Sequence, residues 1–209
     1  MRSRADLLEL AILGLLQESP MHGYELRKRL NLLLGSFRAL SYGSLYPCLK
    51  TLADKALIVG SDAADAPPPH ALSGKRARIV YELTAEGKEH FAHILASSGP
   101  TTWEDEHFDV RFAFFAQTDA ETRLRILEGR RTRLAERLHQ VRQSAARTRE
   151  RLDEYTLELQ RHGLEQVERE VRWLDGLIDN ERGTRRAIDE GIDRPVGPAP
   201  AAGADASQR

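Results

Sequence analysis

The sequence has a single cysteine, Cys48, which excludes an intrachain disulfide and a zinc site built from four cysteines. It also lacks a long apolar run. The apolar stretch from Leu7 to Leu16 is interrupted by Glu9 and is far shorter than the roughly 20 residues that span a bilayer. No positively charged segment leading to a small-residue cleavage site precedes that stretch, so no secretory signal is visible. We therefore expect a cytoplasmic protein without a membrane partner.

The chain also has no excess of one charge, because it contains 31 basic and 32 acidic side chains. The net charge of −1 gives no global attraction to nucleic acid. The distribution is uneven, however, because residues 1–59 carry eight basic and five acidic side chains, whereas residues 119–183 carry fourteen of each. Since 41% of the 209 residues are hydrophobic, the chain has enough apolar material for a core. This pattern favours a modestly basic module joined to a neutral, highly charged helical module.

Apolar residues at helical spacing predict three short helices in the first 55 residues. The first begins at Asp6, which would cap it, and ends at Ser19-Pro20. The second covers 22–34, and its predicted inward residues are Tyr24, Leu26, Leu30 and Leu33. The third covers about 44–55 and buries Leu45, Leu49 and Leu52.

A β-hairpin is predicted to follow the third helix. The segments 57–59 and 78–83 are rich in β-branched and aromatic residues and read as its two strands. Between them, 61–72 contains three consecutive prolines and is not expected to form a ladder strand, while 74–78 is a basic tip. Thr84 then caps another helix. Three helices and a hairpin in this order are typical of a winged helix-turn-helix, which we assign to residues 1–98.

The second half of the chain is predicted to be helical. Ser98-Gly99-Pro100 marks a boundary, and a segment rich in aromatic residues follows it. From Asp119 onward, apolar residues alternate steps of three and four, which predicts an antiparallel coiled-coil dimerisation domain over 99–183. Composition places the turn between its helices at Gly163. Residues 184–209 read as a disordered tail because periodicity is lost there.

These motifs resemble the PadR family of transcriptional regulators. The matching segments are PMHGYEL at 20–26, SYGSLYP at 41–47, GKRAR at 74–78 and YELTAEG at 81–87. The helical half is similar to the branch with a long C-terminal domain, through 108–115 and EVRWL at 170–174. Two features depart from the family pattern. Residues 61–73 are longer and richer in proline than the usual wing, and the family places the helical turn near Ser144 to Glu150 instead of at Gly163.

The resemblance implies a homodimer that is held by its C-terminal helices and binds an inverted-repeat operator on double-stranded DNA. Such proteins usually repress a neighbouring gene and release DNA when a small aromatic effector binds. Two recognition helices related by a two-fold axis would enter major grooves about one helical turn apart, or a multiple of it.

The residues predicted to bind DNA lie in the third helix and at the tip of the wing. They are Tyr42, Ser44, Tyr46, Lys50, Lys75, Arg76 and Arg78. Hydroxyl and cationic groups at these places would contact phosphates or base edges. The alternative for Tyr42 and Tyr46 is that both pack inside the small domain. We interpret His22 and Tyr24 as packing residues.

Aromatic and aliphatic residues of the second half suggest two further surfaces. An effector pocket would use Trp103, Phe108, Phe112, Phe115 and Trp173, although the same rings would equally form a hydrophobic junction between the domains. The predicted dimerisation residues are Leu134, Leu138, Val141, Leu152, Tyr155, Leu159, Val167, Val171 and Leu174.

No cofactor, metal site or catalytic residue is predicted. Tyr42-Gly43-Ser44-Leu45 lacks the second glycine of a nucleophile elbow, and the chain has no phosphate-binding glycine loop. The alternative function is a coiled-coil interaction scaffold with a degenerate winged helix. A basic wing tip distinguishes the two, because a scaffold has no use for three cations at that place.

Overall fold

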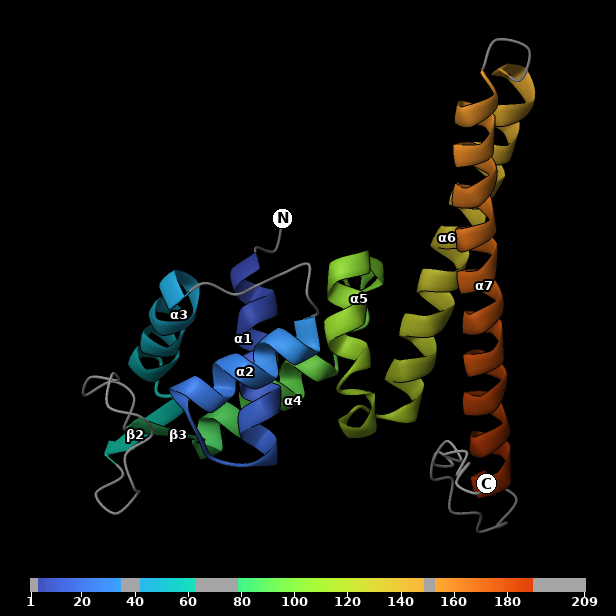
Figure 1. The fold of residues 1–209 in the computed structure, drawn as a ribbon. Coiled ribbons are helices and arrows are strands. Elements are labelled where there is room, and N and C mark those ends of the chain that lie inside the picture. Colours follow the sequence, from blue (N-terminus) through green and yellow to red (C-terminus); the bar gives the residue numbers. More distant parts are fainter. Residues whose placement is uncertain (1–3, 35–41, 63–78, 149–152, 190–209) are drawn as a thin grey trace, which may run out of the picture.

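The computed structural model describes residues 4–34, 42–62, 79–148 and 153–189, and Figure 1 shows their arrangement. Helices dominate it, and three short strands form one antiparallel sheet. The elements in chain order are α1 (Arg4–Glu18), β1 (Met21–His22), α2 (Gly23–Leu34), α3 (Tyr42–Asp54), β2 (Ile58–Asp62), β3 (Ile79–Leu83), α4 (Ala85–Leu95), η3 (Pro100–Trp103), α5 (Asp105–Phe112), η4 (Phe115–Gln117), α6 (Ala120–Thr148) and α7 (Glu154–Asp189).

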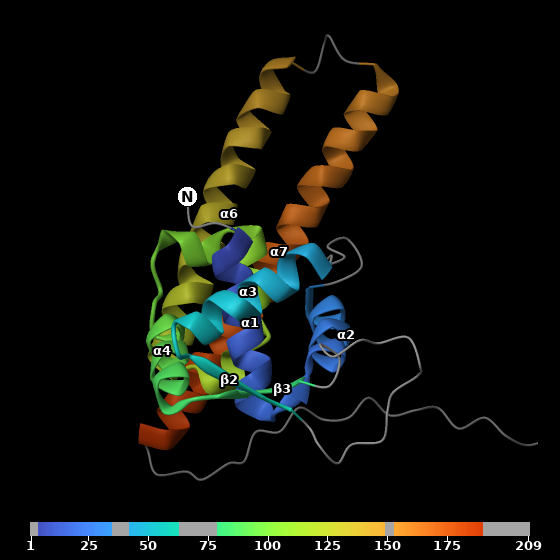
Figure 2. The ribbon, with the colours of Figure 1, turned by 90° about the vertical axis from the view of Figure 1, so that its left-hand side faces the viewer.

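The first part of the chain is a winged helix, as the sequence predicts. The strand order is β1-β3-β2, with Met21 opposite Tyr81 and Ile58 opposite Leu83. α1, α2 and α3 pack their apolar faces together, and Leu26, Leu30, Leu45, Leu49 and Leu52 are 0 to 1% exposed. In Figure 2, α3 crosses the face of this domain above β2 and β3, and α2 lies to one side.

Several local predictions are corrected by the structure. α1 begins at Arg4, so Asp6 lies in its first turn instead of capping it. β1, which the sequence did not suggest, pairs Met21 and His22 with the wing strand β3. β2 extends to Asp62, so the first two residues of the segment predicted to be unpaired join the ladder.

The capping role of Thr84 is confirmed. Its hydroxyl accepts a hydrogen bond from the Gly87 amide at 2.9 Å and donates to the Ala56 carbonyl at 2.7 Å. Gly87 is needed there because a Cβ at this position would lie 2.0 Å from the Leu57 carbonyl oxygen. The start of α4 is therefore fixed against the beginning of the wing.

α5 belongs to two hydrophobic cores at once. Val110 on α5 and Phe114 just beyond it pack in the core of the winged helix, whereas Phe108 and Phe112 pack with α6 and α7. The Phe114 ring lies directly over Gly14 of α1, where an added Cβ would be 2.3 Å from the ring. The predicted domain boundary near residue 98 therefore does not separate two independent cores.

α6 and α7 form a long antiparallel hairpin (Figure 1). Gly163 lies inside α7, so the composition-based turn at that residue is wrong, and the helices change direction between Thr148 and Asp153. α7 continues to Asp189, six residues into the segment predicted to be a tail. Within the described residues, none of the helices combines the length and apolar character that a bilayer crossing requires.

Ion pairs join the two long helices along their length, which accounts for the interleaved arginines and carboxylates of this region. The pairs between α6 and α7 are Arg123–Glu181, Arg130–Glu170, Arg131–Asp175, Arg142–Glu168 and Arg182–Glu128. Most of these side chains are partly exposed, so each pair adds little stability by itself. Together they specify the antiparallel pairing and its register.

Candidate nucleic-acid interface

α3 has the surface expected of a recognition helix. Its apolar residues are buried against α1 and α2, and Ser44, Lys50 and Thr51 remain exposed on the opposite face. The Thr51 hydroxyl donates to the Pro47 carbonyl at 3.0 Å, so it satisfies the carbonyl of its own helix one turn back. Ser44 and Lys50 thus lie on the exposed side of an α-helix, the element that a major groove admits.

Of the two α3 tyrosines that were predicted to bind DNA, the structure describes the side chain of Tyr46 alone. The Tyr46 side chain is half-buried, and its hydroxyl oxygen lies 3.3 Å from where a Cβ on Gly23 would stand. Tyr46 therefore packs over the start of α2, which supports the packing alternative for this residue. Tyr42 begins α3, but its side chain lies outside the described residues, as do Lys75, Arg76 and Arg78 of the wing tip.

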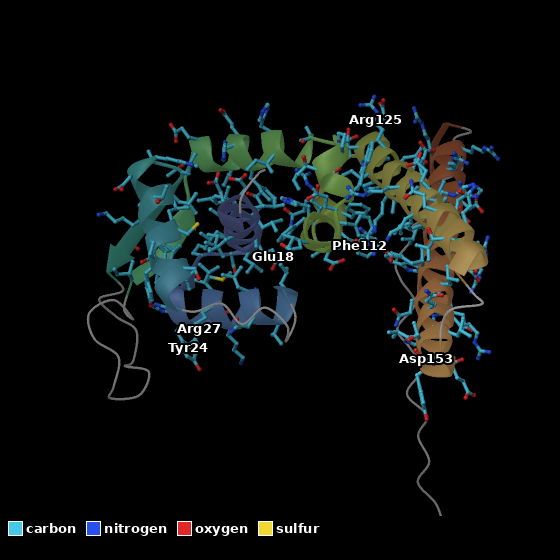
Figure 3. The ribbon with its side chains drawn as sticks, turned by 90° about the horizontal axis from the view of Figure 1, so that it is seen from above. Glu18, Tyr24, Arg27, Phe112, Arg125 and Asp153 are labelled. Carbon is cyan, nitrogen blue, oxygen red and sulfur yellow. The ribbon has the colours of Figure 1, made fainter. Side chains whose placement is uncertain are left out.

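The sequence interpretation places Arg27, Lys28 and Arg29 on the outward side of α2 but assigns that side no DNA contact. Tyr24 was expected to face inward, yet it is 61% exposed, and Figure 3 shows it beside Arg27 on the outward side of α2. Lys28, the next residue along, is also exposed. In a helix-turn-helix the helix before the recognition helix crosses the phosphate backbone, so these residues lie where phosphate contacts occur. Helical spacing in the sequence does predict an outward Tyr24. It is two residues from Leu26 and therefore about 200° around the helix from that buried residue.

Four of the five aromatic residues predicted to line an effector pocket lie together, but their rings pack against one another. Phe108, Phe112, Phe115 and Trp173 form a cluster with ring centres 4.9 to 6.3 Å apart. Trp103 packs against the same core from across Gly129 of α6, where it borders a shallow groove. The rings therefore form the packed junction between α5 and the hairpin, which is the alternative that the sequence left open.

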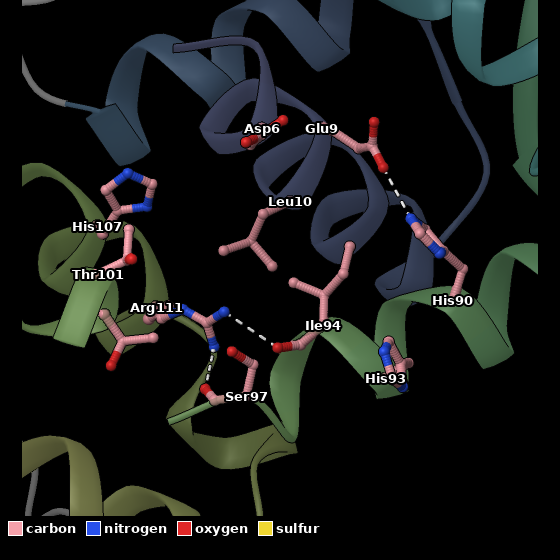
Figure 4. Close-up of a pocket in the computed structure, with 11 residues that line it drawn as sticks. Asp6, Glu9, Leu10, His90, His93, Ile94, Ser97, Thr101, His107 and Arg111 are labelled. Carbon is pink, nitrogen blue, oxygen red and sulfur yellow. Dashed lines mark hydrogen bonds and ion pairs between the residues drawn. The ribbon is translucent and has the colours of Figure 1, made fainter. Parts of the chain in front are cut away.

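A cavity of about 280 Å³ lies instead between α1, α4, η3 and α5 (Figure 4). Glu9 on α1 and His90 on α4 are joined across one side of it, with 2.7 Å between Oε1 and Nε2. Arg111 on α5 is 4% exposed and donates to the carbonyls of Ile94 and Ser97, both at 3.0 Å. Burial lowers the pKa of His107, which therefore stays neutral near pH 7.

The Cys48 thiol on α3 is partly buried. Burial, aided by the negative charge of Glu9, raises the pKa of the Cys48 thiol to about 11, so the thiol is protonated at neutral pH. Among the described residues, no group of three or more histidine, cysteine, aspartate or glutamate side chains has the arrangement of a metal site.

The predicted dimerisation residues divide into two sets. Leu134 and Leu174 are buried within a single chain, and Leu138, Val167 and Val171 are partly buried along the same hairpin. By contrast, Val141, Tyr155 and Leu159 are 40, 86 and 71% exposed near the far end of the hairpin. Leu152 lies outside the described residues. Among the described members, the second set is the more accessible to another molecule.

Residues 12–93, which include all of α2, α3, the wing strands and most of α4, match the family model of the transcriptional regulator PadR-like family. Residues 12–93, which make up most of the winged helix, are therefore similar to this family of transcriptional regulators. The match covers the N-terminal segments of the sequence resemblance, but not residues 108–115 and 170–174. No curated protein matches the chain.

Solved structures of PadR-like proteins match 84 to 87% of this chain. Bacillus subtilis PadR in complex with operator DNA is 21% identical, with a TM-score of 0.39 over 87% of this chain and 98% of the other. The same protein in complex with p-coumaric acid gives 21% identity and a TM-score of 0.37, over 84% and 99%. The PadR-like transcriptional regulator BC1756 from Bacillus cereus gives 17% identity and a TM-score of 0.36, over 85% and 99%.

Proposed function

We propose that this PadR-like protein is a ligand-responsive repressor that binds an inverted-repeat operator as a homodimer. The observation that carries the proposal is the exposed polar face of α3, with Ser44 and Lys50, on a winged helix of a family of transcriptional regulators. In this proposal Lys50 binds a phosphate or guanine, and Tyr24 and Lys28 on α2 position the domain on the backbone. Lys75, Arg76 and Arg78 remain proposed phosphate contacts of the wing tip.

The exposed apolar residues of the hairpin support the dimer. Tyr155 and Leu159 lie one turn apart on α7, and their large exposed fractions are unfavourable in water unless another surface covers them. A second copy would cover them symmetrically, since the same patch faces itself across a two-fold axis. Light scattering should give twice the 23.5 kDa of one chain, and a Tyr155→Arg/Leu159→Arg variant should give a folded monomer.

A mobility-shift titration with the DNA upstream of the protein's own gene tests DNA binding. We expect a specific complex at moderate salt, which Lys50→Ala weakens. The matched control is Lys88→Ala, an exposed lysine on α4, and α4 lies on the opposite side of the domain from α2 (Figure 3). Absence of any specific complex would favour the interaction scaffold instead.

The salt dependence separates phosphate contacts from base contacts. If Arg76 binds a phosphate, Arg76→Ala should weaken specific and nonspecific DNA alike and reduce the slope of log K against log[salt] by about one unit. A slope equal to that of the unmodified protein would remove Arg76 from the interface.

A further inference from the structure

The cavity between the winged helix and α5 has two chemically different walls. On α1, Asp6 and Glu9 are three residues apart and therefore share one face of the helix. On the other side, α4 contributes His93, and α5 contributes His107 and Arg111 (Figure 4). Leu10 and Ile94 add apolar surface. One wall is therefore acidic, and the opposite wall offers a cation and imidazole groups.

The positive charge of the second wall is held in place. The Arg111 side chain is buried, and its hydrogen bonds to the Ile94 and Ser97 carbonyls tie it to the end of α4. A buried guanidinium stabilises a nearby anion more strongly than an exposed one does, because water screens it less. The neutral imidazole of His107 beside it can donate one further hydrogen bond.

We propose that this cavity binds a small zwitterion of the amino acid class as the effector. Its ammonium group would lie against Asp6 and Glu9, its carboxylate against His107 and Arg111, and its side chain against Leu10 and Ile94. A ligand with one charge would satisfy only one wall. The volume of about 280 Å³ is just below the usual range for drug-sized ligands, which fits a single amino acid. The inference rests on the proposed function only in calling the ligand an effector.

Glu9 provides a route from this cavity to the recognition helix. Its Oε2 atom accepts from Nζ of Lys55 at 3.2 Å, and Lys55 directly follows α3. Its Oε1 atom is 2.7 Å from Nε2 of His90. An ammonium group arriving at Glu9 competes with Lys55 for the same carboxylate. Ligand binding thereby loosens the contact that holds the end of α3 to α1.

Matched probes test the charge requirement. The standard amino acids are screened at millimolar concentration by thermal shift, and leucine and phenylalanine are also titrated by calorimetry. Each titration is repeated with the decarboxylated amine, 3-methylbutylamine or phenethylamine, and with the deaminated acid, 4-methylpentanoate or 3-phenylpropionate. We expect at least one amino acid to bind about tenfold or more tightly than its amine and its acid.

Glu9→Gln should weaken that binding about tenfold, whereas Glu89→Gln, an exposed carboxylate of α4, should leave it unchanged. Circular dichroism confirms that both variants are folded. If no amino acid binds, or if an amine or acid alone binds as tightly, the proposal is wrong. DNA binding is measured separately, by a mobility shift without added ligand. If a specific DNA complex forms but no amino acid binds to the protein, this inference is wrong and the DNA-binding function still holds.

Discussion

The guanidinium carbon of Arg130 lies 4.4 Å from the centre of the Phe108 ring. The same side chain, 5% exposed, donates to the Trp103 carbonyl at 3.0 Å and forms ion pairs with Glu170 and with Asp105. One residue of α6 therefore joins η3, α5 and α7. This explains how a buried arginine is tolerated, because its charge is paired and its face is covered by a ring.

Replacing Arg130 with methionine should lower the free energy of unfolding by about 2 to 3 kcal/mol, because the carboxylate of Glu170 loses its buried partner. Urea denaturation followed by circular dichroism measures this free energy of unfolding. The control is Arg131→Met, whose ion pair with Asp175 is about half exposed and should contribute less than about 1 kcal/mol. Equal losses in the two variants would contradict the special role of Arg130.

Two glycines inside helices should respond oppositely to alanine. Gly163 has open space around its Cβ position, so Gly163→Ala should stabilise the protein by about 0.5 to 1 kcal/mol. Gly14→Ala places a methyl group 2.3 Å from the Phe114 ring and should destabilise by about 1 to 3 kcal/mol. Thermal unfolding measures both. Adding Phe114→Leu to Gly14→Ala should reduce the penalty relative to the sum of the single changes.

The Cys48 thiol should react slowly with iodoacetamide. Because its pKa is about 11, the thiolate fraction near pH 8 is about 100-fold lower than that of a thiol with a pKa of 9.0. Mass spectrometry of the folded protein, with a cysteine peptide as reference, measures the rate. The rate should still increase with pH above 9. Fast alkylation at neutral pH would instead make Cys48 a candidate redox switch.

The lowered pKa of His107 predicts a dependence of stability on pH. The unfolded chain binds a proton at this residue more readily than the folded chain does, so unfolding takes up protons as the pH falls below the ordinary histidine pKa. His107→Asn should therefore lose less stability than the unmodified protein between about pH 8 and about pH 5.5. Chemical denaturation at both pH values tests this, and parallel losses in the two proteins would contradict it.

Local chemistry made much of the winged helix predictable. The Thr84 cap and the buried leucines of α3 follow from spacing along one element, and both are confirmed. Gly163 misled the interpretation because a glycine is tolerated in a helix whose neighbours supply the packing, and here Val167 and Val171 pack against α6. Helix propensity alone cannot show that support.

The cavity could not be predicted from the sequence. Its walls combine Asp6 and Glu9 with His90 and with Arg111, from three helices, the first and last of which are more than a hundred residues apart in the sequence. The aromatic residues were the more visible signal, but composition does not show whether rings enclose a space or fill it. Only the ring separations of about 5 to 6 Å decide that Phe108, Phe112 and Trp173 fill it.

Because α5 packs in both cores, it joins the winged helix rigidly to the α6–α7 hairpin, which pairs two chains in the proposed dimer. The rotation of one head relative to the other about the duplex axis would thus be set when the protein folds. Each base pair inserted between two half-sites turns them by about 35° relative to each other, which moves one groove away from its helix. Such a protein would accept operators of one spacing and reject those longer or shorter by a few base pairs.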